Sequence, residues 1–279
     1  KTIRRRITTR DAAFELLRDL DQSAAVYAAL RDPQDPSWVA DERRTLEQLV
    51  MFNVRQPLAM LLACHGRFYE SERAGFTRIM KTVAVVSFRY NVICNLQTHE
   101  QERLYNGIAW KVSAGTYSRA SDVIFALREV YPDDSQFKAA FSEKELRTTN
   151  SRNKKVVRYI LFEIERQRSG KSFEFESATY NLEHILPEHP SEAWSYIEES
   201  KQDRLIYRIG NMAPLETSRN RDLGNASYAV KKAVYEQSDF EITRAVAEHY
   251  DTWDEPKIEA RQKQLATIAA GIWKAEFGA

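Results

Sequence analysis

The change of pattern at Ser169–Gly170–Lys171–Ser172 constrains the fold of this chain more than any other feature. Over residues 1–170, glycine and proline are scarce and apolar residues recur at spacings of three and four, which predicts helices. After the break, Phe173–Glu176 alternates with period two. Residues 180–187, which end in a proline, and residues 205–209 are typical of short strands. The sequence therefore predicts a mainly helical chain with an embedded strand–loop–strand–helix unit.

Start and stop signals place the helices. Thr9 or Asp11 can cap the first helix, and Asp254 can cap the last one, with Pro256 in its first turn. A helix after the second strand is expected to begin at Thr217 or Ser218. Other helices are expected over residues 41–54, 72–96, 100–113, 118–130, 134–146, 152–167 and 228–235. We expect two domains, a helical one over residues 1–168 and a second over residues 169–279.

Charge divides at the same break. The whole chain has 279 residues, with 41 Lys+Arg, 40 Asp+Glu and a net charge of +1. Residues 1–171 hold 29 Lys+Arg against 21 Asp+Glu, a balance of +8, and residues 172–279 hold 12 against 19, a balance of −7. The near-zero total is therefore no argument against a polyanionic partner.

Several classes of protein are excluded. With 43% hydrophobic and 29% charged residues the chain has a globular composition, and its apolar runs are too short to span a bilayer. No signal peptide is visible, and Cys64 and Cys94 are interpreted as reduced core thiols, so we expect a cytoplasmic protein. The start at Lys1 rather than at a methionine suggests a processed chain or an excised fragment.

Four polar residues form a candidate site around the strands. Glu183 and His184 end the first strand, Asn211 follows the second, and Asn220 lies at the start of the next helix. Phosphodiester hydrolysis needs a base for water and a hard cation for the phosphate. Imidazole suits the first task, and carboxylate and amide oxygens suit Mg²⁺. Taken singly, the histidine and the asparagine after a glycine are more typical of structural residues.

At these residues the sequence resembles the HNH (His-Me finger, ββα-metal) nucleases. The resemblance lies in Leu-Glu-His-Ile-Leu-Pro over residues 182–187, Ile-Gly-Asn-Met-Ala-Pro-Leu over 209–215 and Ser-Arg-Asn-Arg over 218–221. More narrowly, the chain is similar to the C-terminal region of GmrSD-type modification-dependent restriction endonucleases over roughly residues 180–273. That similarity continues through Leu-Gly-Asn-Ala-Ser-Tyr over residues 223–228 and ends at Ile-Trp over 272–273.

The resemblance implies a role for each residue of the candidate site. His184 is the expected general base, and Glu183 and Asn220 are the expected ligands of Mg²⁺ or Mn²⁺. Asn211 is expected to brace the loop and to hold the His184 ring by a hydrogen bond. Adjacent residues on an ideal strand point to opposite faces, so Glu183 reaches the cation only if the strand has begun to turn.

Basic residues near the site are the candidates for contacts with DNA. Arg219 and Arg221 flank Asn220, and Lys154, Lys155 and Arg158 precede the second domain. A further basic cluster spans residues 1–10. Such clusters can neutralise phosphates, although a solvated helix face has the same pattern.

The resulting hypothesis is a metal-dependent DNA endonuclease of the HNH class in a bacterial anti-phage restriction system. The fold that the resemblance implies is a helical domain, which contacts DNA or transmits a signal, followed by a small ββα-metal nuclease module embedded in helices. The family also implies an N-terminal nucleotide-hydrolysing domain, whose motifs this chain lacks. Nicking and double-strand cleavage both remain open, because one such site cuts one strand and a double cut needs two chains or two events. The alternative is a non-catalytic helical module for nucleic-acid binding or assembly, with a decayed HNH-like fold.

Overall fold

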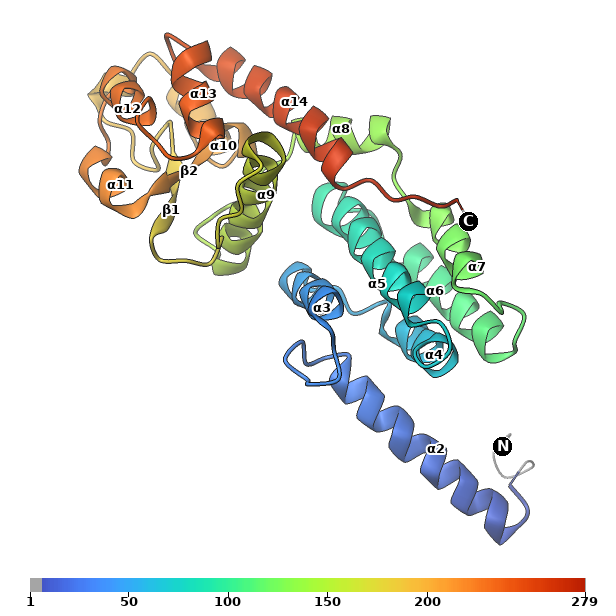
Figure 1. The fold of residues 1–279 in the computed structure, drawn as a ribbon. Coiled ribbons are helices and arrows are strands. Elements are labelled where there is room, and N and C mark those ends of the chain that lie inside the picture. The colour runs from blue at the N-terminus through green and yellow to red at the C-terminus, as the bar shows by residue number, and fades with distance from the viewer. Residues whose placement is uncertain (1–6, 279) are drawn as a thin grey trace. The chain divides into compact units, whose positions relative to one another are not determined.

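A computed structural model describes residues 7–278, the side chain of Asp222 excepted. The chain forms two compact units. The first unit runs to Tyr131 and includes the residues from Ala275 onward, and the second unit is Pro132–Lys274. Both units are mainly helical, as the sequence predicts (Figure 1).

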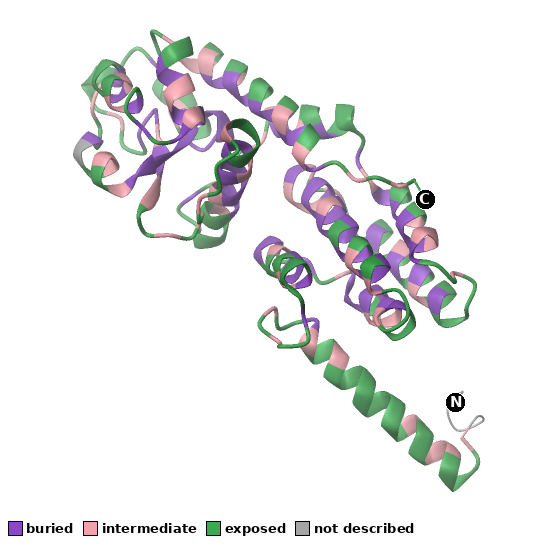
Figure 2. Ribbon diagram, viewed as in Figure 1, coloured by how far each residue is buried: buried purple, intermediate pink, exposed green. Residues whose placement is uncertain are grey.

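The first unit is a helical assembly around α5. Its helices are α2 (Arg10–Ala29), α3 (Ala40–Phe52), α4 (Leu58–Phe68), α5 (Arg73–Ser87), α6 (Thr98–Ser113) and α7 (Ala120–Ala126). Helix α5 continues as a π-helix over Phe88–Ile93, and α7 continues as a 3₁₀ turn over Leu127–Val130. Phe76, Ile79 and Met80 of α5 are fully buried. Helix α2 has no buried residue, and Figure 2 shows most of it as exposed.

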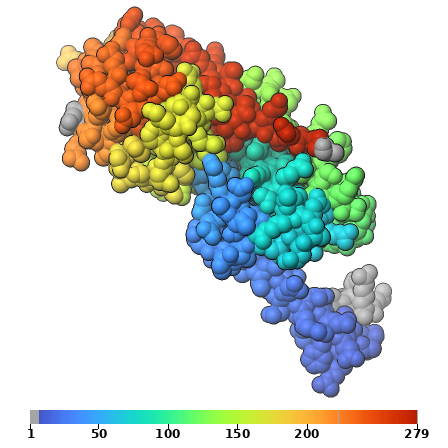
Figure 3. All heavy atoms as spheres, viewed as in Figure 1, coloured from blue at the N-terminus to red at the C-terminus, as the bar shows by residue number. Residues whose placement is uncertain are grey.

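The second unit places helices around a two-stranded antiparallel sheet. Strand β1 (Tyr180–His184) pairs with β2 (Met212–Glu216), so that His184 lies opposite Met212. The helices are α8 (Asp134–Ser142), α9 (Ser151–Ser169), α10 (Glu199–Ile206), α11 (Thr217–Leu223), α12 (Tyr228–Tyr235), α13 (Glu241–His249) and α14 (Glu255–Ile272). Helices α9 and α13 contact β2, and α11 contacts both strands. Figure 3 shows one outer face of the molecule with all heavy atoms as spheres.

One of the two expected strands is wrong. Residues 205–209 form the end of α10 and the beginning of a 3₁₀ turn, η4 (Ile209–Asn211), and the second strand starts only at Met212. A short apolar run cannot distinguish a buried strand from a buried helix end, which explains the error. Phe173–Glu176 also lies outside both strands. Phe173 instead packs its ring against those of Phe162, Tyr180 and Phe240, and the ring centroids of Phe173 and Phe240 are 4.6 Å apart.

The helix signals at the two ends of the chain are confirmed. The hydroxyl of Thr9 accepts a hydrogen bond from the Ala12 amide at 3.2 Å, and the carboxylate of Asp254 accepts one from the Lys257 amide at 3.1 Å. These caps satisfy amides that a helix leaves without an internal partner. Helix α13 was not expected from the sequence.

The boundary between the compact units lies between Tyr131 and Pro132, whereas the sequence analysis divides the chain after residue 168. The reason is that α8 and α9 pack with the elements that follow them, α8 against α14 and α9 against β2, α13 and α14. The predicted assignment of functions to residues 1–168 and 169–279 stays a prediction. Within residues 7–278, no helix is both long enough and apolar enough to cross a membrane.

Gly210 marks a point where α14 approaches the backbone of the 3₁₀ turn η4. A Cβ atom at Gly210 would lie 2.3 Å from the carbonyl oxygen of Ile258 and 2.8 Å from the Cβ of Gln262. Neither the helix backbone nor a Cβ atom can move aside as the far end of a long side chain does. The residue before Asn211 therefore has to be a glycine for α14 to pack here.

Replacing Gly210 by alanine is expected to destabilise the second unit by about 1–3 kcal/mol, the usual cost of overpacking. Gly271→Ala is the matched control, because Gly271 lies in α14 with no atom within 4 Å of its added Cβ. Urea unfolding followed by circular dichroism measures both variants. Equal stability of Gly210→Ala and wild type would contradict the close approach.

Candidate active site

The last two residues of β1 place their side chains in opposite environments. Glu183 is 4% exposed, and its Oε1 accepts hydrogen bonds from the Lys231 ammonium and the Tyr235 hydroxyl, each at 2.7 Å. The His184 side chain is on the other face and is 11% exposed. This opposition follows from the alternation of side chains along a strand. The structure therefore does not bring together the two adjacent residues that the sequence assigned to one site.

The His184 ring lies among polar side chains from other elements. Its Nε2 atom is 3.0 Å from the Thr148 hydroxyl and 3.8 Å from a carboxylate oxygen of Glu188. The Tyr207 ring contacts the imidazole edge-on, with 6.1 Å between the ring centroids. Burial lowers the pKa of His184 to about 4; Glu188 opposes this shift, and the charges of Lys231 and Lys154 add to it. The imidazole is therefore neutral near pH 7 and able to accept a proton.

Asn211 is fully buried and braces the chain that follows His184. Its side-chain oxygen accepts hydrogen bonds from the Leu186 amide at 2.8 Å and from the Trp253 indole at 2.9 Å. Its side-chain nitrogen donates to the carbonyls of Leu186 at 2.9 Å and Ile206 at 3.1 Å. The expected bracing contact is thus present, but these hydrogen bonds go to backbone groups and an indole, not to the His184 ring. The geometry fits a positioning residue.

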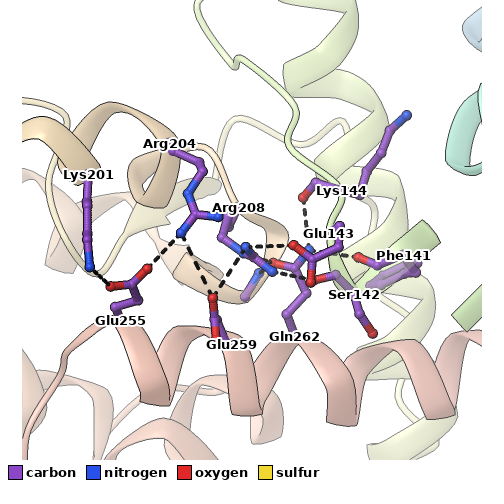
Figure 4. A network of polar contacts seen from close by, with 11 residues as sticks. Phe141, Ser142, Glu143, Lys144, Lys201, Arg204, Arg208, Glu255, Glu259 and Gln262 are labelled. Atoms are coloured by element: carbon purple, nitrogen blue, oxygen red, sulfur yellow. Dashed lines mark hydrogen bonds and ion pairs between the residues drawn. The ribbon is translucent and has the colours of Figure 1, made fainter. Parts of the chain in front are cut away.

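Helix α14 and a buried arginine hold the turn that contains Asn211. Arg261 donates to the carbonyls of Gly210 and Met212, both at 2.7 Å. Gln262 accepts from the Gly210 amide at 3.0 Å and donates to two carbonyls near the end of α8. Arg208 has no exposed surface, and its guanidinium contacts the side chains of Gln262 and Glu143, each at 3.3 Å (Figure 4). The position of Asn211 thus depends on contacts from α8, α10 and α14.

The two predicted metal ligands differ in how well they suit a cation. Asn220 lies on α11, and its side-chain nitrogen donates to the Leu182 carbonyl at 3.3 Å, so its amide oxygen is the atom that suits a divalent cation. Glu183 does not fit, because the Lys231 ammonium already occupies the cationic position beside its carboxylate. Across the described residues, no group of three or more His, Cys, Asp or Glu side chains forms a metal site. A cation here would rely on Asn220, water and phosphate oxygens, a set that Mg²⁺ accepts.

The predicted DNA-contacting residues are not equivalent in the structure. Lys154 is exposed, and its charge acts on the His184 ring. Lys155 forms an ion pair with Glu176 at 2.5 Å. Arg158 is half-buried and donates to the backbone carbonyls of Phe175, Ser177 and Tyr180, so it holds a loop and is not free for phosphate.

The two arginines beside Asn220 also differ from each other. Arg219 lies 3.5 Å from a carboxylate oxygen of Glu216, and Arg221 is exposed. Most of the N-terminal basic cluster, residues 1–6, lies outside the described residues.

Sequence reasoning missed Thr148 and Glu188. Thr148 comes from the loop between α8 and α9, which runs beside Tyr207 and Arg208 through a backbone hydrogen bond at Leu146 and an isolated bridge at Glu145. Nothing in a single sequence marks this long-range pairing. Glu188 lies four residues after His184, and this closeness in the sequence is the one feature that could have indicated its contact with the imidazole.

Part of the chain matches a known protein family. Residues 131–268 match the family described as GmrSD restriction endonucleases, C-terminal domain. The match begins one residue before the second compact unit and ends within α14. It contains all of the site residues described above. No curated protein matches the chain.

Replacing Asn211 by alanine is expected to destabilise the second unit, because it leaves buried backbone and indole groups without partners. Each such group costs about 1–3 kcal/mol. Asn225→Ala, at an exposed position after α11, is the control and is expected to change stability by no more than about 0.5 kcal/mol. Chemical denaturation measures both variants, and an unchanged midpoint for Asn211→Ala would refute the bracing role.

Proposed function

We propose that residues 131–268, which match the family of GmrSD restriction endonuclease C-terminal domains, form a metal-dependent DNA endonuclease of the HNH class. The proposed role is that of the cutting part of a bacterial anti-phage restriction system, with Mg²⁺ or Mn²⁺ as cofactor. The observation that carries the proposal is a neutral, slightly exposed imidazole at the end of β1, next to the helix that bears Asn220.

His184 is the proposed general base. Its neutral ring takes a proton from the water that attacks the phosphorus atom. Thr148 lies within hydrogen-bond distance of Nε2 and orients this water or the ring. The negative phosphate raises the pKa of the imidazole when DNA is bound, which strengthens it as a base.

Asn220 is the proposed protein ligand of the cation, through its amide oxygen. When bound, such a cation stabilises negative charge on the phosphate and on the departing oxygen. The other predicted ligand, Glu183, is left out of this role because its carboxylate is buried with Lys231 and Tyr235. One site of this kind cuts one strand, so nicking is the elementary reaction.

The basic part of the DNA-contacting surface lies on α9. Residues 132–171 hold 10 Lys+Arg against 6 Asp+Glu, and they belong to the same compact unit as His184. The long α9 begins at Ser151 and is capped by the side chain of Asn150, and its amino-terminal end also favours anions. Lys154 is the residue of this helix that combines exposure with proximity to the imidazole.

Cleavage of supercoiled plasmid in Mg²⁺ or Mn²⁺ tests the nuclease proposal. His184→Ala is expected to slow nicking by about 10²–10⁴-fold, the usual contribution of a general base. The matched control is His189→Ala, at an exposed position five residues further on, which is expected to cleave like wild type. EDTA should abolish cleavage, and Asn220→Ala should raise the metal concentration needed for half-maximal rate.

Equal cleavage by wild type, His184→Ala and Asn220→Ala would refute the assignment. DNA binding without cleavage under any metal would favour the non-catalytic alternative.

A pair of neighbouring lysines tests the DNA surface. Lys154→Ala is expected to weaken DNA binding at every sequence and to reduce the slope of log K against log salt by about 1, because one phosphate contact is lost. Lys155→Ala is the charge-matched control, because Glu176 already pairs with this lysine. Fluorescence anisotropy over a range of salt concentrations measures both. The same salt slope for both variants would show that α9 does not present Lys154 to DNA.

A further inference from the structure

Lys231 makes two contacts that the mechanism above does not use. Its Nζ atom lies 2.7 Å from a carboxylate oxygen of Glu183 and 2.7 Å from the backbone carbonyl oxygen of His184. The Lys231 side chain has no exposed surface, and the Glu183 side chain is 5% exposed. We propose that Lys231 is a positioning residue that fixes the direction of the His184 ring from the inner face of β1. This inference rests on the proposed role of His184.

The peptide group between His184 and Ile185 is held at both of its polar atoms. Its carbonyl oxygen accepts a hydrogen bond from Lys231 on α12, and its amide nitrogen donates to the backbone carbonyl of Asn211 at 2.9 Å. A peptide group is planar, so two bonds on opposite sides fix its orientation. Because that peptide plane is attached directly to the His184 Cα, its orientation determines the direction in which the His184 side chain projects from β1.

Glu183 has a different task from the one that the sequence suggested. A lysine side chain is flexible and has three donors, so a second anchor is needed to aim one of them at a single carbonyl. The carboxylate of Glu183 supplies that anchor, and the Tyr235 hydroxyl donates a second hydrogen bond to the same carboxylate oxygen at 2.7 Å. Lys231 and Tyr235 are four residues apart on α12 and therefore share a face.

Because the cluster is buried, losing any of its members is expected to lower the stability of the fold. Burial raises the pKa of the Glu183 carboxyl, with Lys231 and Tyr235 opposing the shift, and burial lowers the pKa of Lys231. Removing one partner of a buried ion pair leaves an uncompensated group, whereas replacing both by apolar residues is often neutral. Stability and positioning can therefore be separated by experiment.

The test compares Lys231→Met with the double variant Glu183→Leu/Lys231→Met. The single variant is expected to lower the Tm, and the double variant is expected to recover most of that loss. In both, kcat for plasmid nicking should fall about 10- to 100-fold, as for other misplaced catalytic groups. The KM for DNA should stay within about twofold, because a buried lysine contributes nothing to ground-state binding.

Tyr235→Phe is the control, because it removes a hydrogen bond to Glu183 and leaves the Lys231 contact with the His184 carbonyl. It is expected to lower the Tm but to keep kcat within about twofold of wild type. Amide hydrogen exchange gives a readout that does not depend on activity. The Ile185 amide should exchange faster in both Lys231 variants and at the wild-type rate in Tyr235→Phe.

A double variant that regains both wild-type Tm and wild-type kcat would overturn the inference, since the cluster would then serve stability alone. If the double variant does not unfold cooperatively, the comparison of Lys231→Met with Tyr235→Phe tests the inference instead. Equal kcat and equal Ile185 exchange in Lys231→Met and Tyr235→Phe would also overturn it. The His184→Ala variant separates failure of this inference from failure of the proposed function. If His184→Ala cleaves plasmid at the wild-type rate, the nuclease assignment itself is refuted.

Discussion

The site depends on the opposite directions of two adjacent side chains at the end of β1. Glu183 points inward to a lysine and a tyrosine of α12, and His184 points outward to Thr148 and Glu188. The inward contacts are buried and charged, so a rotation of the strand end would break them. Asn211 adds a second constraint, because it holds the residues that follow the histidine. The outward imidazole is thus fixed by groups that never face the solvent.

The two compact units change the interpretation of the charge distribution. A division at residue 171 gave balances of +8 and −7, which suggested a basic domain beside an acidic one. At the boundary between Tyr131 and Pro132, the first unit holds 19 Lys+Arg against 16 Asp+Glu and the second holds 22 against 24, so the balances are +3 and −2. The basic residues of α9 belong with the histidine. Affinity for DNA therefore need not come from a separate domain.

The sequence predicted local features well and long-range ones poorly. Helix caps, the first strand and the motifs around His184, Asn211 and Asn220 depend on residues close together in the chain, and a single sequence records them. The second strand was misplaced because an apolar run of five residues fits a helix end as well as a strand. Thr148 could not be found, because its approach to His184 depends on pairing between residues 145 and 208. The role of Glu183 as a metal ligand was implied by the family resemblance and depended on a turn of the strand end; strand alternation instead places it on the face opposite His184.

The central claim is that DNA is cut on the outward face of β1, while the inward face only holds the base. A crystal structure of the His184→Ala variant with duplex DNA and Mn²⁺ tests it most directly, because manganese is identified by its anomalous scattering. The account predicts a phosphate beside Thr148 and Lys154, manganese at the Asn220 amide oxygen, and Glu183 still paired with Lys231. Manganese bound by Glu183, or DNA bound away from the outward face, would contradict it.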